Sequence, residues 1–143
     1  MALNLKAVRS GAGSGVAAAM AMSGMRLLTT ELGLVEEVPP RAIMRQKTPV
    51  VFGILPTEHH QAAVEIAHWA YGGVGGGAFG LMPRRLRRHR WAGPAYGLFV
   101  WAVFEALLAP ALGLEQARRA RPVERLMFAL DHVFYGLLVA RAH

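Results

Sequence analysis

The stretch that decides the fold is EIAHWAYGGVGGGAFG, residues 65–80, inside an apolar run of residues 61–82. Gly72, Gly76 and Gly80 are spaced four residues apart, so one side of a helix through this stretch is almost bare backbone. So many glycines weaken a helix in water. In a lipid bilayer they form a packing face, because small residues let helix backbones approach closely. The stretch therefore predicts a membrane-spanning helix.

Composition supports a membrane protein of a single domain. The 143 residues are 54% hydrophobic and 17% charged, with a mean hydropathy of +0.30, which is more apolar than an ordinary soluble domain. The absence of cysteine excludes disulfides and thiolate metal sites. The net charge of +7 comes from basic residues in short loops beside apolar runs. That placement favours membrane topology and anionic lipid headgroups as its cause, and no nucleic-acid partner is expected.

Four apolar segments, at about residues 10–30, 61–82, 91–114 and 123–140, are each close in length to the ~20 residues that a spanning helix needs. They predict an all-α fold, an integral membrane four-helix bundle that occupies residues 1–143 as one membrane domain. A signal peptide competes for the first segment, but its four-spaced small residues favour a retained span. The predicted packing glycines of the four spans are Gly11, Gly15, Gly72, Gly76, Gly80, Gly93, Gly97 and Gly136.

The basic loops predict the orientation. With four spans, both termini and the loop PRRLRRHR (residues 83–90) share one side, which carries no acidic residue. Its five arginines favour a cytoplasmic location for both termini in a bacterial inner membrane.

Two short motifs recur in the same order and suggest a duplicated two-helix hairpin. LGL occurs at residues 32–34 and again at 112–114, and H-x-x-Y-G occurs at 68–72 and 132–136. A two-span unit preserves orientation, so the two copies form parallel repeats.

The repeat and the helical rise place six ionisable residues of the four spans at similar depth, about 10 Å from the non-cytoplasmic surface. This predicted polar layer consists of Arg26, Glu65, His68, Glu105, Asp131 and His132. In its simplest role the layer locks the helices together. Arg26 then pairs with Glu105 or Asp131, and each histidine bonds to a backbone carbonyl or to Tyr71 or Tyr135.

Three functional interpretations remain open, and none is an enzyme, because the small loops leave no room for a catalytic domain. The first is a packing subunit that associates through its glycine faces, as an accessory subunit of a membrane assembly or as a homo-oligomer. The second is a small transporter or a proton or cation conduit through the polar layer. The third uses His68 and His132 as ligands of haem, a pigment or a metal. Glu65-x-x-His68 matches half of a di-metal motif, but Ala129 stands where the second glutamate is needed.

The segments MSGMRLLTTELGLVEEVPPRAI (residues 22–43), AHWAYGGVGGGAFG (67–80) and DHVFYGLL (131–138) resemble a group of small bacterial inner-membrane proteins of actinobacterial type. The resemblance covers most of the chain. It implies four membrane spans and transfers no site residues.

Overall fold

The computed structural model describes residues 4–34, 54–111 and 120–142, and within these ranges the regular structure is helical throughout. The all-α prediction is confirmed. The long helices are α1 (Leu5–Glu31), α4 (His60–Leu81) and α9 (Pro122–Ala140), together with α6 (Ala92–Val103), which continues through η2 (Phe104–Leu108) and α7 (Ala109–Ala111). The single-turn elements η1 (Thr57–His59) and α5 (Arg84–Arg87) flank α4. Residues 112–114 of the third predicted span, and most of the 29–60 connection, lie outside the described residues.

Local sequence accounts for where these helices begin. The Asn4 side chain caps α1 by accepting a hydrogen bond from the Ala7 N–H at 3.1 Å. Pro122 occupies the first position of α9, where its missing N–H costs nothing. The turn Phe104–Leu108 is π-helical and ends two residues before Pro110, which has no N–H to donate to the preceding turn.

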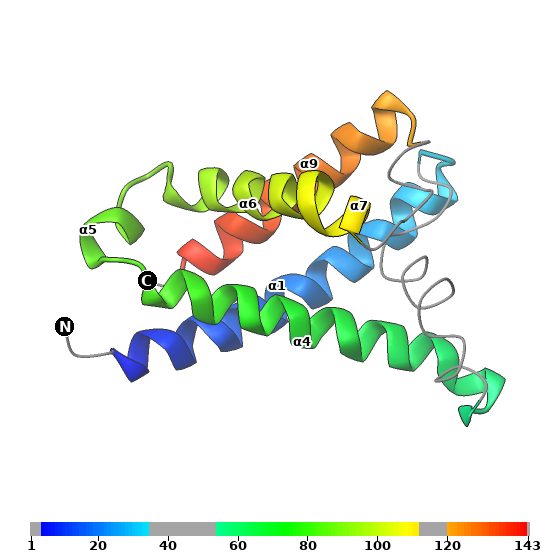
Figure 1. Cartoon of the computed structure of the whole chain (residues 1–143), viewed down its shortest axis with the longest axis horizontal. Helices are drawn as coiled ribbons and strands as arrows, with labels where there is room; N and C mark the ends of the chain where they lie inside the picture. The colour runs from blue at the N-terminus through cyan, green and yellow to red at the C-terminus, as the bar shows by residue number, and fades with distance from the viewer. Residues whose placement is uncertain (1–3, 35–53, 112–119, 143) are drawn as a thin grey trace.

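The helices form two antiparallel hairpins. α4 packs against α1, and α9 packs against α6, while contacts between α1 and α9 join the two hairpins. Both termini and α5 lie at one end of the bundle (Figure 1). This is the arrangement that the predicted topology requires.

Glycine backbones make both hairpin interfaces. A Cβ added to Gly15 would overlap the Gly72 carbonyl oxygen, and one added to Gly76 would overlap the Gly11 carbonyl oxygen. In the second hairpin a Cβ on Gly136 would overlap the carbonyl oxygen of Gly93. All eight predicted packing glycines are buried. The faces expected to mediate association are thus covered within the chain, and a second subunit would have to dock elsewhere.

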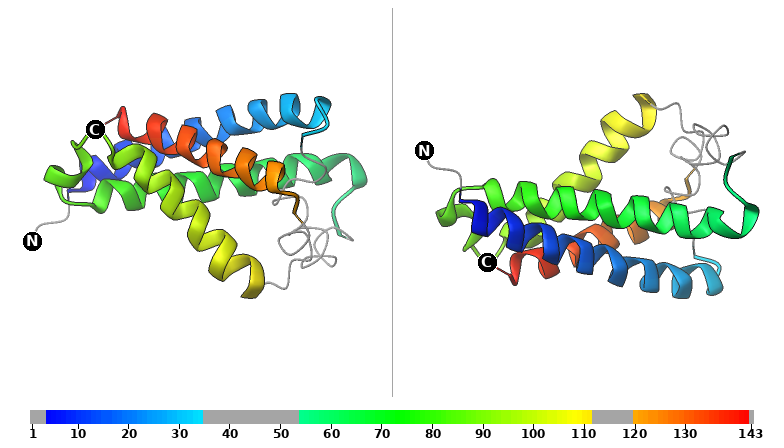
Figure 2. Two further views of the ribbon diagram at one scale, coloured as in Figure 1. Left: turned by 90° about the horizontal axis from the view of Figure 1, so that it is seen from above. Right: turned by 90° about the horizontal axis from the view of Figure 1, so that it is seen from below.

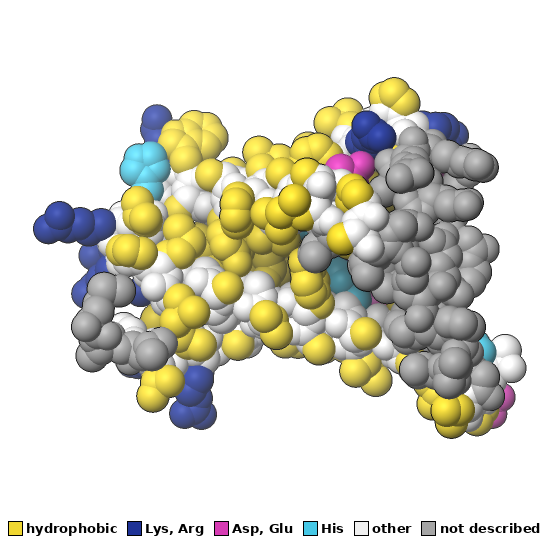
Figure 3. Space-filling model, viewed as in Figure 1, with side chains coloured by type: hydrophobic (Ala, Val, Ile, Leu, Met, Phe, Trp, Pro, Cys, Tyr) yellow, Lys and Arg dark blue, Asp and Glu magenta, His cyan; other side chains and the backbone are white. Residues whose placement is uncertain are grey.

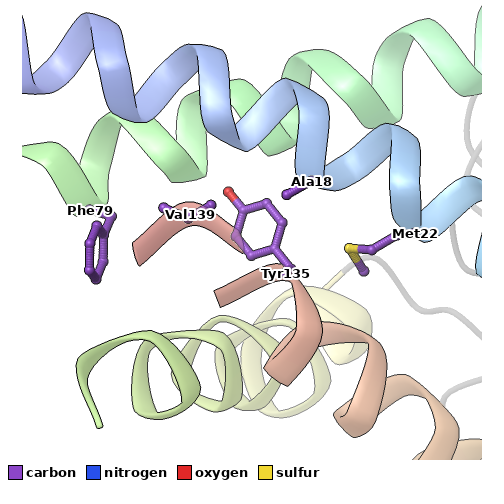
Figure 4. Packing of buried hydrophobic residues seen from close by; sticks show 5 residues of the cluster. All are labelled: Ala18, Met22, Phe79, Tyr135 and Val139. Carbon is purple, nitrogen blue, oxygen red and sulfur yellow. The ribbon is translucent and has the colours of Figure 1, made fainter. Parts of the chain in front are cut away.

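The core between the hairpins is small. It is formed by Ala18 and Met22 from α1, Phe79 from α4, and Tyr135 and Val139 from α9. Figure 4 shows Tyr135 at the centre of this cluster, with the α1 side chains on one side and Phe79 on the other.

Large apolar side chains lie mostly outside the bundle. Ile66 and Val74 on α4 are 61% and 73% exposed, and Phe99 and Leu107 on the α6 segment are both 63% exposed. Small residues therefore fill much of the helix contacts, and most of the large apolar residues outside the core lie at the surface.

By length and composition, one helix among the described residues, Ala92–Ala111, is sufficiently long and apolar to cross a membrane. The other three long helices are less apolar, because glycines, alanines and the residues of the polar layer dilute their aliphatic residues. The prediction of four spans is therefore neither confirmed nor contradicted by hydropathy.

Candidate functional site

The predicted polar layer separates into links between different pairs of helices. Arg26 of α1 lies with its Nε 3.6 Å from Oδ2 of Asp131 on α9, and the two side chains are only 11% and 10% exposed. Of the two partners expected for Arg26, Asp131 is the one that it pairs with. Because both charges are nearly enclosed, each depends on the other for compensation.

A second link joins α1 to α4. The Ser23 hydroxyl donates a hydrogen bond to the Glu65 carboxylate, and the Trp69 indole N–H donates to the Ser23 oxygen at 3.2 Å. Ser23 therefore connects Glu65 to Trp69 across the hairpin interface, next to the glycine face.

The third link joins α6 to α9 and lies closer to the surface. Glu105, in the π-helical turn, has its Oε1 3.6 Å from Nε of Arg125, and the two side chains are 22% and 48% exposed. Glu105 does not pair with Arg26. Its partner Arg125 lies in the polar start of the last helix, outside the predicted polar layer.

The two histidines differ in their bonding. Nδ1 of His132 lies 2.7 Å from the Phe128 carbonyl oxygen one turn earlier. This contact requires a proton on Nδ1 and leaves Nε2 with a free lone pair. Nε2 of His68 is buried and has no hydrogen-bond partner in the described part of the chain. The expected bond to a carbonyl is thus present for His132 and absent at this His68 nitrogen.

Both histidines line one cavity of about 180 Å³ between α4, α6 and α9. Met22 of α1 and the apolar Val100 and Val103 of α6 complete much of its wall. The cavity is open on one side, where α6 diverges from α4 (Figure 2). Figure 3 shows a histidine side chain inside the recess between these helices.

All three tyrosines of the chain also line the cavity, and sequence reasoning gave them too little weight. The Tyr135 hydroxyl donates to the Gly72 carbonyl at 2.6 Å, and the Tyr96 hydroxyl donates to the Gly75 carbonyl at 2.7 Å. Neither binds a histidine, contrary to the expectation for Tyr135. Tyr96 follows Gly93 by three residues, a spacing that places it beside the packing face.

Tyr71 is the exception among the tyrosines. Its hydroxyl has no hydrogen bond to any described residue, although the side chain borders the cavity beside His68. The arrangement therefore brings together one unpartnered imidazole nitrogen, one imidazole lone pair and one unpartnered hydroxyl in an apolar recess. Such a recess can bind a small molecule that carries hydrogen-bonding atoms.

A metal site of three or more ligands is not formed by the histidine, aspartate and glutamate side chains of residues 4–34, 54–111 and 120–142. Comparison of the chain with protein-family models, with curated proteins and with solved structures finds no match. The resemblance to small inner-membrane proteins remains a prediction.

Proposed function

We propose that this protein is an integral four-helix bundle of the bacterial cytoplasmic membrane and serves there as a non-catalytic accessory subunit. The observation that carries the membrane assignment is the distribution of side chains. On the face drawn in Figure 3, hydrophobic side chains gather along the middle of the molecule, and lysine and arginine lie toward its two ends. A bilayer solvates such a belt, whereas water would not.

Helix lengths agree with this location. α4 has 22 residues and α9 has 19, which correspond to about 33 Å and about 28 Å of helix, against about 30 Å for the hydrocarbon core of a bilayer. The end that carries both termini and α5 has exposed arginines at Arg84, Arg85 and Arg88. We assign this end to the cytoplasm.

The two hairpins are proposed to be parallel repeats of one unit. Gly15 of α1 faces Gly72 of α4, and Gly93 of α6 faces Gly136 of α9. Gly72 and Gly136 hold the same position in the two H-x-x-Y-G motifs. The same interface thus recurs at the positions that the motifs align.

The accessory role is supported by the way the polar layer is used. Each acid of the layer joins a different pair of helices: Asp131 joins α9 to α1, Glu65 joins α4 to α1, and Glu105 joins α6 to α9. Acids engaged in this way stabilise the relative positions of helices. A proton or cation conduit would instead need acids that face a continuous hydrated path.

The absence of cysteine makes the topology directly testable. Single cysteines at Thr57 and Arg88, on opposite ends of α4, should differ in reactivity toward a membrane-impermeant maleimide on spheroplasts. We expect labelling of Thr57→Cys in intact spheroplasts and of Arg88→Cys only after permeabilisation. Labelling of both in intact spheroplasts would refute the proposed topology.

Native gels of solubilised membranes test the accessory role. The chain has a mass of 15.5 kDa, and an accessory subunit should migrate in a much larger, reproducible complex. A species no larger than the monomer plus its detergent would contradict the role.

A specific observation favours a second candidate, ligand binding through His68 and His132. The two histidines line the same cavity, and the buried Nε2 of His68 is left without a partner. A buried polar group without a hydrogen bond costs about 1–3 kcal/mol, so packing alone does not account for His68. Absorption spectroscopy and metal analysis of the purified protein test for a bound cofactor.

A further inference from the structure

We propose that the cavity lined by His68, His132 and Tyr71 binds the head group of a lipophilic quinone or quinol. This inference rests on the proposed membrane location and deepens the ligand-binding candidate above. It concerns binding only.

The hydrogen-bonding groups define the polar part of the ligand. The His132 Nε2 lone pair accepts a hydrogen bond, because Nδ1 carries the proton toward the Phe128 carbonyl. The Tyr71 hydroxyl donates, and His68 Nε2 has no protein partner. A quinone carbonyl accepts hydrogen bonds, and a quinol hydroxyl both donates and accepts them. The quinone and quinol pair therefore complements the groups that the fold leaves unused.

The walls of the cavity define the rest of the head group. Tyr71, Tyr96, Tyr135 and Phe99 supply aromatic rings, and the remaining lining is almost entirely apolar. Aromatic rings pack favourably against one another in offset or edge-on arrangements. A flat ring with oxygen atoms at its edge fits this lining better than a charged or aliphatic head group does.

The size of the cavity and its opening also favour a quinone head group as the ligand. A cavity of about 180 Å³ is below the ~300–1,000 Å³ of pockets that enclose drug-sized ligands. It suits one or two fused rings, and it is too small to enclose haem unless α6 moves. Val74 of α4 and Phe99 of α6 border the cavity and are 73% and 63% exposed, so the cavity has a lateral opening between these two helices. An aliphatic tail can leave through this opening into the hydrocarbon phase.

The test uses the full chain in mild detergent, titrated with a decyl-substituted 1,4-benzoquinone and followed by tryptophan fluorescence. Trp69 and Trp101 neighbour the lining residues His68 and Val100 in sequence, so a bound quinone should quench them. Decylbenzene, which has the same tail and no oxygen, is the matched probe and competes for the site only if binding is purely apolar. We expect saturable quenching by the quinone that decylbenzene does not displace.

The protein variants provide the second comparison. His68→Phe keeps a ring of similar size and should raise the dissociation constant about tenfold, which corresponds to one lost hydrogen bond of about 1.4 kcal/mol. His59→Phe, at an exposed position outside the cavity, should leave it unchanged. Tyr71→Phe removes only a hydroxyl and should weaken binding several-fold even if His68→Phe fails to fold. Circular dichroism and gel filtration check the fold of each variant.

Several outcomes would overturn the proposal. They are quenching that never saturates, equal binding of decylbenzene, affinities of both cavity variants equal to wild type, and a haem Soret band in the purified protein. If the maleimide labelling is as expected but no quinone binds, the quinone proposal is wrong and the proposed membrane topology stands. If the maleimide labelling contradicts the topology, the membrane assignment is wrong, and the quinone proposal has no basis.

Discussion

Replacing Gly15 with alanine should destabilise the protein relative to the same replacement at Gly13, two residues away on α1. A Cβ at Gly15 would overlap the Gly72 carbonyl and lie 3.0 Å from the Gly76 Cα, whereas a Cβ at Gly13 meets nothing within 4 Å. Both replacements gain the same helix propensity, about 1 kcal/mol. That contribution cancels when the two variants are compared.

The expected difference follows from the contact distances. Carbon atoms pack at about 3.5–4.0 Å, so α1 and α4 must separate by roughly 0.5–1 Å to admit the new methyl group. A gap of that size removes about a quarter to a half of the dispersion energy of the contacts that it affects. The neighbours are backbone atoms and cannot rotate away. We therefore expect Gly15→Ala to be about 1–3 kcal/mol less stable than Gly13→Ala.

Unfolding in sodium dodecyl sulfate from mild detergent measures this difference, with tryptophan emission as the probe. Trp69 is well placed for it, because its indole donates a hydrogen bond to Ser23 across the α1–α4 interface. Free energies of Gly15→Ala and Gly13→Ala that agree within about 0.5 kcal/mol, the scatter of surface substitutions, would refute the assigned interface.

Two further predictions concern the polar groups. Asp131→Asn leaves the Arg26 guanidinium without its charge partner in a site where both side chains are nearly enclosed, so stability should fall by roughly 3 kcal/mol. The paired replacement of Arg26 by Met and Asp131 by Leu should recover most of that loss in the same unfolding assay; no recovery would show that the pair is not the cause. Tyr135→Phe removes the hydrogen bond to the Gly72 carbonyl and should cost about 1 kcal/mol. Tyr71→Phe, which removes a hydroxyl without a protein partner among the described residues, should leave stability unchanged, and an equal effect of the two tyrosine variants would contradict the bonding described.

Helix positions and helix contacts were accessible from sequence because both depend on local spacing. The predicted spans of residues 61–82 and 123–140 differ by one residue at most from α4 and α9, whereas α1 begins five residues before the predicted 10–30 segment. Four-residue spacing identifies which residues share one face of a helix. A face made of glycines carries no side chains, so the backbone of a neighbouring helix can contact it directly. The close approach of Gly15 to Gly72 is the geometric result.

The partners within the polar layer were not accessible in the same way. Depth along the bundle axis follows from the helical rise, but the rotation of each helix about its own axis does not. The depth of Arg26 could therefore be predicted, but not which acid it pairs with. Glu105 was placed in the same layer as Arg26, although the two residues do not form an ion pair. Ser23 was not among the predicted residues of the polar layer, although its hydroxyl is what joins Glu65 to Trp69.

The opening between α4 and α6 follows from how the two hairpins meet. α1 packs against both α4 and α9, whereas α6 packs closely along α9 alone among the long helices. The remaining side is bridged by Tyr96, whose hydroxyl reaches the Gly75 carbonyl and whose ring packs against Phe79 at 5.0 Å between centroids. Beyond this bridge α6 diverges. A bundle in water would close that side to bury its apolar residues, because exposed apolar area is costly there. Lipid chains are as apolar as those side chains, so in the proposed membrane setting an open side carries little penalty and can admit a lipophilic ligand.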